Sequence, residues 1–346
     1  MRGTLGVAGA VAIAVATAGC SFLRPPSPAP VRPAAPSKAP AKRFTEQTFE
    51  RKALASYVIK TPKPGAKTDT VVGDVRTVTV RERDTLLDLA RYYDLGFEEL
   101  QQANPGVDPW VPKVGSQVVI PTQFVLPCCS YEGIVLNIPE MRLYYYRPGQ
   151  LPDTTIVETF PLGLGRADYQ TPLGVFLVKG KTVNPAWGVP ERIRQEHIRE
   201  RSDPRKFIKG GDPDNPLGKY RFELNRTLYR IHSTNFPWGI GRLVSHGCAQ
   251  LYPEDMAHLF PLVPIGTRVE FIYQPVKVGR RAGSTWVESH PDIYGKSAPP
   301  LDQAQAALKS QGLTADPVRL ENALRDGHGV PRQVEGGRFW SWVKSF

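Results

Sequence analysis

The stretch IHSTNFPWGIGRLVSHGCAQL, residues 231–251, contains the residues that say most about this chain. Cys248 follows His246 by two positions, and His232 stands near the start of the stretch. A thiol is mostly protonated at neutral pH, and an imidazole beside it can accept that proton. We therefore expect Cys248 to act as a nucleophile with His246 as its base. Gly247 allows a close backbone approach, so N–H groups of this turn are candidates to hold a tetrahedral oxyanion.

Three other interpretations of Cys248 stay open at this point. The thiol is buried and inert, as many cysteines are, or it forms a disulfide with Cys128 or Cys129, or it binds zinc together with the two histidines. The spacing lacks the paired cysteines or histidines typical of zinc sites, so we expect no metal and no cofactor. Adjacent cysteines seldom bridge without strain, and two free thiols are at least as good an interpretation of Cys128 and Cys129 as a vicinal or intermolecular disulfide.

Short strands separated by turn residues dominate the sequence before and after this stretch. Residues 134–138 and 142–146 predict a pair of strands around Pro139-Glu140, and residues 155–161 and 175–179 predict two more. Such a succession of short strands predicts a β-rich domain.

Residues 76–121 follow a different pattern, which predicts a βααβ unit. Residues 77–80 alternate like a strand, and 117–120 return as a second strand that ends at Pro121. Between them, a helix is expected after the cap Asp84-Thr85 and before Gly96, and another over 97–102. The first helix has apolar residues at helical spacing, namely Leu86, Leu89, Ala90 and Tyr93.

The N-terminus is typical of an export signal. Arg2 precedes a small-apolar run over 5–16, which is shorter than the ~20 residues of a membrane-spanning helix. Thr17-Ala18-Gly19-Cys20 resembles a bacterial lipobox, with Thr17 where that motif usually has Leu. The resemblance implies removal of residues 1–19 and acylation of Cys20. Ordinary secretion without a lipid is the alternative.

Residues 20–75 are expected to form a tether rich in Pro, Ala and Lys, with a short helix within 44–59 and more linker over 61–70. The formal net charge of +11 favours an anionic partner, such as nucleic acid, anionic lipid or a carboxylate-rich wall polymer, or serves solubility alone. The sequence has no RNP, zinc-finger or helix-turn-helix signature, so we expect no nucleic acid.

Within the βααβ unit, three segments together resemble a LysM domain: VRERDTL at 80–86, LQQANP at 100–105 and VGSQVVIP at 114–121. The resemblance implies that residues 76–122 bind glycans containing N-acetylglucosamine, chiefly peptidoglycan. A structural mini-domain without sugar affinity is the alternative.

The segments IHSTN at 231–235, GIG at 239–241 and VSHGC at 244–248 are similar to the active-site stretch of the L,D-transpeptidase (YkuD) family. Further motifs agree in order: NIPEMRLY at 137–144, TPLGVF at 171–176, NPAW at 184–187 and NPLG at 215–218. The resemblance covers residues 131–274 and implies a β-sandwich-like catalytic domain. The expected fold class is therefore α+β and mostly β, with the LysM module before this domain and a mixed subdomain over 275–346 after it.

The same resemblance implies a reaction and a location in the cell. Cys248 would attack the peptide bond that follows meso-diaminopimelate in a tetrapeptide stem, the terminal D-residue would leave, and an acceptor amine would resolve the acyl-enzyme. His232 would shape the substrate or oxyanion site, and Ser245 would orient His246. The products would be 3-3 cross-links or an attached outer-membrane lipoprotein, made by a periplasmic enzyme that a lipid anchors to a membrane. An L,D-carboxypeptidase, with water as acceptor, and a degenerate wall-binding scaffold are the alternatives.

One position departs from the family pattern. The family usually has Arg or Asn two residues after the nucleophile, where this chain has Gln250. Gln250 keeps hydrogen-bonding capacity but lacks the cation that holds a substrate carboxylate. Arg242 is a candidate replacement, and Trp187 and Asn235 complete the expected substrate-binding residues.

Beyond residue 274, helical periodicity predicts two helices, over 301–313 and 317–325. The simplest interpretation is a subdomain that packs on the catalytic core. A gating or partner-binding role is the alternative.

Overall fold

The structure is a computed structural model that describes residues 54–63, 68–226 and 229–335. All of these residues belong to one unit of the chain, residues 50–346. The expected signal peptide, the acylated Cys20 and most of the expected tether lie outside the described residues. Within the described ranges, no helix combines the length and the apolar character needed to cross a bilayer.

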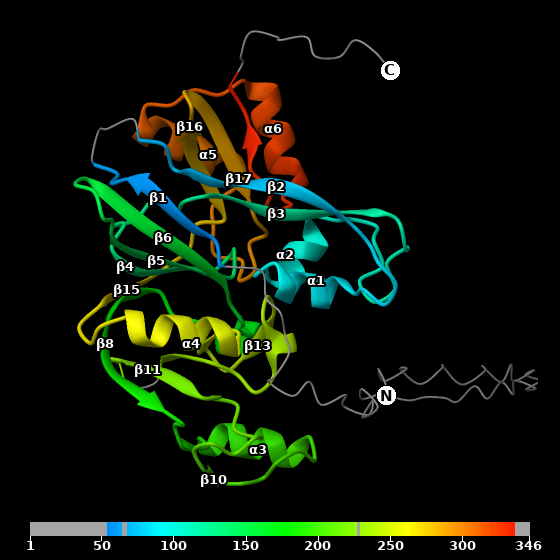
Figure 1. Cartoon of the computed structure of the whole chain (residues 1–346), viewed down its shortest axis with the longest axis vertical. Coiled ribbons are helices and arrows are strands. Elements are labelled where there is room, and N and C mark those ends of the chain that lie inside the picture. The colour runs from blue at the N-terminus through cyan, green and yellow to red at the C-terminus, as the bar shows by residue number, and fades with distance from the viewer. Residues whose placement is uncertain (1–53, 64–67, 227–228, 336–346) are drawn as a thin grey trace, which may run out of the picture. The chain divides into compact units, whose positions relative to one another are not determined.

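A nine-stranded mixed sheet runs through the middle of this unit (Figure 1). Two of its neighbouring pairs, β15 with β4 and β12 with β14, are parallel, and the other pairs are antiparallel. In spatial order the strands are β1 (Ser56–Lys60), β6 (Thr154–Pro161), β5 (Arg142–Pro148), β4 (Gly133–Asn137), β15 (Arg268–Ile272), β8 (Gly174–Val183), β11 (Tyr220–Leu224), β12 (Arg230–His232) and β14 (Ala249–Gln250).

Both halves of this sheet contribute to one core. Phe160 from β6 and Phe222 from β11 are fully buried in the same apolar cluster, together with Met256 of helix α4 (Pro253–Leu262). The predicted strand pair around Pro139-Glu140 is confirmed, because β4 and β5 pair antiparallel. The mixed, mostly β fold class is confirmed as well. The β-sandwich-like description stays a prediction, since one continuous sheet supplies both sides of the core.

The predicted βααβ unit is confirmed and consists of β2 (Val71–Thr79), α1 (Leu86–Tyr92), α2 (Phe97–Gln102) and β3 (Gln117–Val125). The Thr85 hydroxyl caps α1 by accepting the Asp88 N–H at 3.0 Å. Leu86 and Leu100 are fully buried between the helices and the two strands. Gly96, expected to end the first helix, is the N-cap of the second. We call β2 through β3 the βααβ module.

Two expectations around the βααβ module are wrong. Ser56–Lys60, placed in a tether and partly in a helix, forms strand β1, where Val58 lies opposite Ile156 of β6. The β-branched residues of this segment suit a strand that covers the open edge of β6. Pro121 does not end β3, which continues to Val125. Strands β2 and β3 form a two-stranded ribbon, and a proline that faces its open edge costs no ladder hydrogen bond.

The βααβ module contacts the loop that precedes Cys248 through its backbone. The N–H groups of Phe97 and Glu98, in the first turn of α2, donate to the carbonyls of Ile240 and Gly241 at 3.3 and 3.2 Å. N–H groups at a helix start have no partner inside the helix, so these carbonyls satisfy them. Gly241 has a φ of +78°, and a Cβ there would lie 2.1 Å from the Phe97 nitrogen. Only glycine fits this approach.

Two ion pairs reinforce this contact. The Arg142 guanidinium of β5 lies 2.6 Å from a Glu99 carboxylate oxygen of α2, and both side chains are almost fully buried. Arg91 of α1 binds Glu254 of α4 through two hydrogen bonds of 2.9 and 3.0 Å. Burial raises the pKa of Glu99 although Arg142 opposes that shift. The pair therefore specifies how the module docks more than it stabilises the fold.

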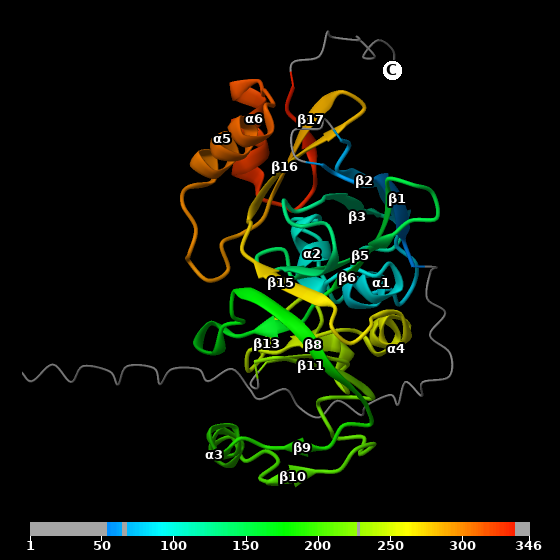
Figure 2. The ribbon, with the colours of Figure 1, turned by 90° about the vertical axis from the view of Figure 1, so that its left-hand side faces the viewer.

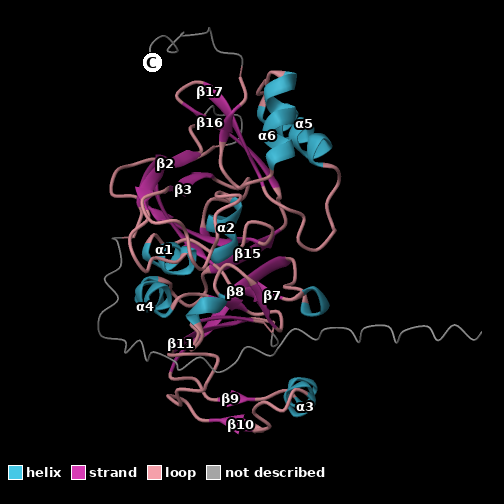
Figure 3. Ribbon diagram, turned by 90° about the vertical axis from the view of Figure 1, so that its right-hand side faces the viewer, coloured by secondary structure: helices cyan, strands magenta, loops and turns pink. Residues whose placement is uncertain are grey.

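The C-terminal region has a sheet and two helices of its own (Figures 2 and 3). Strands β16 (Val276–Arg281), β17 (Ser284–Ser289) and β18 (Arg332–Gln333) form the sheet. Helix α5 (Pro300–Gln311) contacts β16, and α6 (Pro317–Asp326) contacts β17. Both predicted helices are confirmed to within two residues at each end. Their apolar sides and the sheet enclose a separate small core.

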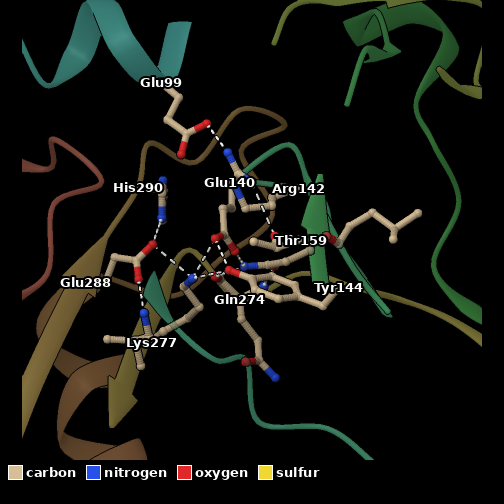
Figure 4. Close-up of polar contacts among 12 residues, drawn as sticks. Glu99, Glu140, Arg142, Tyr144, Thr159, Gln274, Lys277, Glu288 and His290 are labelled. Carbon is tan, nitrogen blue, oxygen red and sulfur yellow. Dashed lines mark hydrogen bonds and ion pairs between the residues drawn. The ribbon is translucent and has the colours of Figure 1, made fainter. Parts of the chain in front are cut away.

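A buried cluster of charges joins this C-terminal sheet to the rest of the unit (Figure 4). The Lys277 Nζ lies 2.7 Å from Glu140 Oε1 and 2.9 Å from Glu288 Oε1. Glu288 also accepts the backbone N–H of Val125, in β3, at 2.6 Å. Desolvation would raise the pKa of Glu288, but Lys277 and His290 outweigh it and keep that pKa below its usual value. One ammonium thus holds the central sheet, the βααβ module and the C-terminal sheet together.

We expect Lys277→Met to lower the free energy of unfolding by about 3–5 kcal/mol, because it leaves Glu140 and Glu288 buried without their cation. Lys309→Met changes an exposed lysine of α5 and serves as the control, with an expected change within about 0.5 kcal/mol. Urea denaturation of both variants measures the difference. Equal stabilities would show that the ammonium does not hold the cluster.

Candidate active site

The turn that carries Cys248 is fixed by the hydroxyl of Ser245. This hydroxyl donates to the Cys248 carbonyl at 2.6 Å and accepts the Gly247 N–H at 3.1 Å. Gly247 has a φ of +103°, which favours glycine. Strand β13 (Leu243–Ser245), just before the turn, pairs with β7 (Leu164–Gly165). In the structure, Ser245 therefore fixes the nucleophile turn, whereas its expected contact was with His246.

Cys248 is a free, partly exposed thiol. Cys128 and Cys129 are free thiols too, so the interpretation of Cys248 as half of a disulfide with either of them is wrong. Cys248 is partly exposed and its thiol is desolvated, so the interpretation as a buried thiol stays open. Cys129 is partly exposed as well, and burial raises its pKa to about 12.

The pairing of β12 with β14 brings His232 to the nucleophile. His232 lies opposite Gln250 in this parallel pair, and Cys248 immediately precedes β14, two residues before Gln250. Side chains two positions apart along an extended chain point to the same face. The imidazole of His232 and the thiol of Cys248 therefore share one face of the pair.

His232 is held as a neutral imidazole. Its Nδ1 lies 2.6 Å from the Ser233 carbonyl, which can only accept, so Nδ1 carries a hydrogen. The Leu217 carbonyl is a further hydrogen-bond partner of the ring. The side chain is buried, with 2% of its surface exposed. Desolvation, assisted by the charges of Arg230 and Arg221, lowers the pKa of His232 to about 4. At neutral pH this ring can accept a proton.

Two arginines that the sequence analysis missed surround this pair. Arg221 lies opposite His232 on β11, and Arg230 stands two residues before His232 on β12. Burial raises the pKa of Cys248, and the charges of Arg230 and Arg221 oppose that shift together with hydrogen bonds from Arg230. The thiol and His232 thus share one cationic neighbourhood. The alternation Arg-Ile-His at 230–232, within a strand, is the signal that places Arg230 on the face of His232.

His246 has different neighbours. Its Nε2 lies 3.1 Å from a Glu196 carboxylate oxygen and 3.4 Å from the Arg166 guanidinium, and its ring meets the Tyr169 ring edge-on with centroids 4.5 Å apart. Glu196 comes from helix α3 (Glu191–Arg199). No sequence motif marks this glutamate, because α3 reaches the nucleophile turn only through the tertiary structure.

The other expected substrate-binding residues are more scattered. The Arg242 guanidinium lies over the rings of Phe97 and Trp110 in the βααβ module, 4.1 and 5.9 Å from their centroids, and its role toward the substrate stays a prediction.

Gln250 exchanges backbone hydrogen bonds of 2.8 and 2.9 Å with Gly163. Asn235 is exposed and donates to the Pro213 carbonyl at 3.1 Å. Trp187, in β9 (Trp187–Gly188), lies beside His197 of α3, with ring centroids 6.4 Å apart.

One group of side chains has the composition of a metal site. Ligand atoms of Glu140, Glu288 and His290 lie within 4.8 Å of one another. The Lys277 ammonium, however, already contacts both carboxylates. This cation supplies the positive charge that the two glutamates require, so the group is a structural ion-pair cluster.

The chain matches two families of known domains. Residues 132–271 match the L,D-transpeptidase catalytic domain (YkuD), and residues 78–121 match the LysM domain. The probable L,D-transpeptidase ErfK/SrfK of Escherichia coli K12 is 39% identical over 77% of this chain and 88% of its own length. The probable L,D-transpeptidase YbiS of the same strain is 37% identical over 75% and 87%. Among solved structures, L,D-transpeptidase 3 from Mycobacterium tuberculosis has 21% identity and a TM-score of 0.30, over 45% of this chain and 67% of its own.

The low pKa of His232 predicts that stability falls as the pH is lowered from about 6.5 to about 4. Between these values the unfolded chain binds a proton on this residue that the folded chain does not. The free energy of unfolding therefore falls, by at most about 3 kcal/mol. His232→Gln should remove this part of the dependence. Denaturant unfolding at pH 7 and pH 4.5 measures it.

His258→Gln, at a partly exposed histidine beside Glu158, is the matched control and should keep the dependence of the wild type. An identical loss of stability in the wild type and in His232→Gln would contradict the assignment of a buried neutral ring.

Proposed function

The chain belongs to the L,D-transpeptidase (YkuD) family, and from this premise we propose that it remodels peptidoglycan by acyl transfer through Cys248. It is an enzyme of a cysteine-based family that acts on peptidoglycan. Peptidoglycan is its partner through both the LysM domain and the transpeptidase domain. The observation that carries the proposal is the unbridged, partly exposed Cys248 on one face with the neutral ring of His232.

The proposed first step is acylation. The Cys248 sulfur attacks the carbonyl carbon of meso-diaminopimelate in a tetrapeptide stem, the C–N bond to the terminal D-residue breaks, and a thioester forms. The thiol proton passes to a histidine and from there to the leaving amine, so that the D-residue departs as a neutral amine. Backbone N–H groups around Gly247 are the proposed donors to the tetrahedral oxyanion.

His232 suits the role of the base in this step better than His246, to which the sequence analysis gave it. His232 shares its face and its two arginine neighbours with Cys248, and its low pKa keeps the ring neutral at physiological pH. The Nε2 of His246 is engaged by Glu196. The hydrogen bond from His232 Nδ1 to the Ser233 carbonyl supports the ring in the tautomer that a base requires.

The charges around the thiol suit an anionic substrate. Arg221 and Arg230 bring two cations to the nucleophile, which favours a stem peptide with free carboxylates over a neutral one. These arginines take the place that the family pattern gives to the residue at Gln250.

The proposal also covers the membrane anchor of the enzyme and the acceptor of the acyl group. Acylation of Cys20 would anchor the enzyme to a membrane of the cell envelope, with residues 20–53 as the described unit's connection to it. The acceptor amine would come from a second stem peptide, which gives a 3-3 cross-link, or from an outer-membrane lipoprotein. Mass spectrometry of muropeptides from cells with and without the enzyme separates these products from the tripeptides that a carboxypeptidase would leave.

We expect Cys248→Ala to abolish both the thioester adduct and the release of the terminal D-residue from a disaccharide-tetrapeptide. His232→Gln should lower the acylation rate by about 10²- to 10⁴-fold, the usual contribution of a general base. His258→Gln, on α4, should leave that rate unchanged. Mass spectrometry of the protein after rapid mixing measures the adduct. An active Cys248→Ala variant would end the proposal.

Arg230→Gln should slow the alkylation of Cys248 by iodoacetamide at pH 7 several-fold, because removal of the cation raises the pKa of the thiol and lowers the thiolate fraction. The alkylation profile should move to higher pH. Arg319→Gln, at an exposed arginine of α6, is the control and should follow the wild type. If Arg230→Gln reacts at the wild-type rate, Arg230 does not stabilise the thiolate.

A further inference from the structure

Helix α3 lies on a segment inserted between strands β8 and β11 (Figures 2 and 3). This insertion also contains the short pair of β9 with β10 (Phe207–Ile208). Both of these strands are outside the nine-stranded sheet. The insertion reaches the nucleophile turn through α3, whose Glu196 is buried although the helix lies at the edge of the unit.

The Glu196 carboxylate collects three donors. One oxygen accepts from the Arg166 guanidinium at 2.7 Å, and the other accepts from the Tyr169 hydroxyl and from His246 Nε2, each at 3.1 Å. Desolvation opposes ionisation, but the hydrogen bonds from Arg166 and His246 hold the pKa of Glu196 near about 2. At physiological pH Glu196 is therefore ionised, and it can accept hydrogen bonds but cannot donate them.

The geometry at Glu196 fixes the tautomer of His246. Because an ionised carboxylate cannot donate, the hydrogen between them sits on His246 Nε2. In the neutral ring, Nδ1 is then the nitrogen that can accept a proton. Carboxylates that hold an imidazole in this way also stabilise the imidazolium that forms when the ring acts as a base.

A second side chain of α3 contacts the segment that contains Arg166 and Tyr169. Arg192, one helical turn before Glu196, lies over the Tyr169 ring at 4.4 Å, and Tyr169 packs against the edge of His246. The backbone N–H of Arg166 donates to the Ser245 carbonyl at 3.0 Å, which connects this loop to the nucleophile turn. The segment with Arg166 and Tyr169 thus links α3 to the Cys248 turn. It contacts α3 through side chains and the turn through a backbone hydrogen bond.

We propose that Glu196 is the positioning residue of His246 and that His246 is the base of the second half-reaction. In that step the acceptor amine attacks the thioester carbonyl and loses its proton to His246 Nδ1. The C–S bond breaks, and the proton held by His246 passes through solvent to the Cys248 thiolate, because His232 gave its proton to the leaving amine during acylation. The proposal rests on the proposed function and assigns one histidine to each substrate, His232 to the acyl donor and His246 to the acceptor amine.

The test separates the two half-reactions in Glu196→Gln. With a disaccharide-tetrapeptide alone, the variant should form the acyl-enzyme within about twofold of the wild-type rate. On addition of an acceptor stem peptide, its aminolysis rate should fall by roughly ten- to a hundredfold, so that the acyl-enzyme accumulates. Glu196→Asp keeps the charge and should recover most of the aminolysis rate.

Glu191→Gln is the matched control on the same helix, because its carboxylate binds Arg194 and Gln195 within α3 and does not reach His246. This variant should behave as the wild type in both steps. Equal aminolysis rates in Glu196→Gln and the wild type would overturn the proposal. A proportional loss of acylation and aminolysis would also overturn it, since that result indicates a structural role. Failure of the wild type to form any acyl-enzyme would instead refute the proposed function.

Discussion

The parallel pairing of β12 with β14 is the contact on which the active site depends. Ile231 lies opposite Ala249, and both are fully buried in the core of the central sheet. Because side chains alternate along a strand, the neighbours of these two residues face the other way, which brings His232 and Cys248 to one side. A slip of one residue would turn the imidazole into the core. The burial of two apolar residues thus sets the geometry of the polar ones.

The loop that connects these two strands is also the docking surface of the βααβ module. Residues 239–242 lie between His232 and Cys248 in the sequence, and two of their carbonyls complete the start of α2. Gly241 has no room for a side chain against Phe97. A glycan held by the LysM domain is therefore held by a structure that is hydrogen-bonded to the loop between His232 and Cys248.

Local sequence patterns predicted most of the elements but few of the contacts between them. The cap at Thr85 and the spacing of Leu86 and Ala90 define α1 without reference to other parts of the chain. Strand β1 was missed because its pairing with β6 joins residues far apart in the sequence. The stacking of Arg242 on Phe97 was not predicted, since nothing in the sequence shows where the βααβ module docks. Glu196 was missed for the same reason.

The electrostatics of the two histidines explain why one chain needs both. Burial and the charges of Arg230 and Arg221 disfavour the charged form of His232, whereas the Nε2 of His246 lies 3.1 Å from the Glu196 carboxylate. Burial also raises the pKa of Cys248, so the thiol and His232 rest as a neutral pair rather than as an ion pair. The proton must then move as the C–S bond forms, when the charge passes from sulfur to the carbonyl oxygen. In the proposed step, the charges of Arg230 and Arg221 favour the sulfur anion over the neutral thiol.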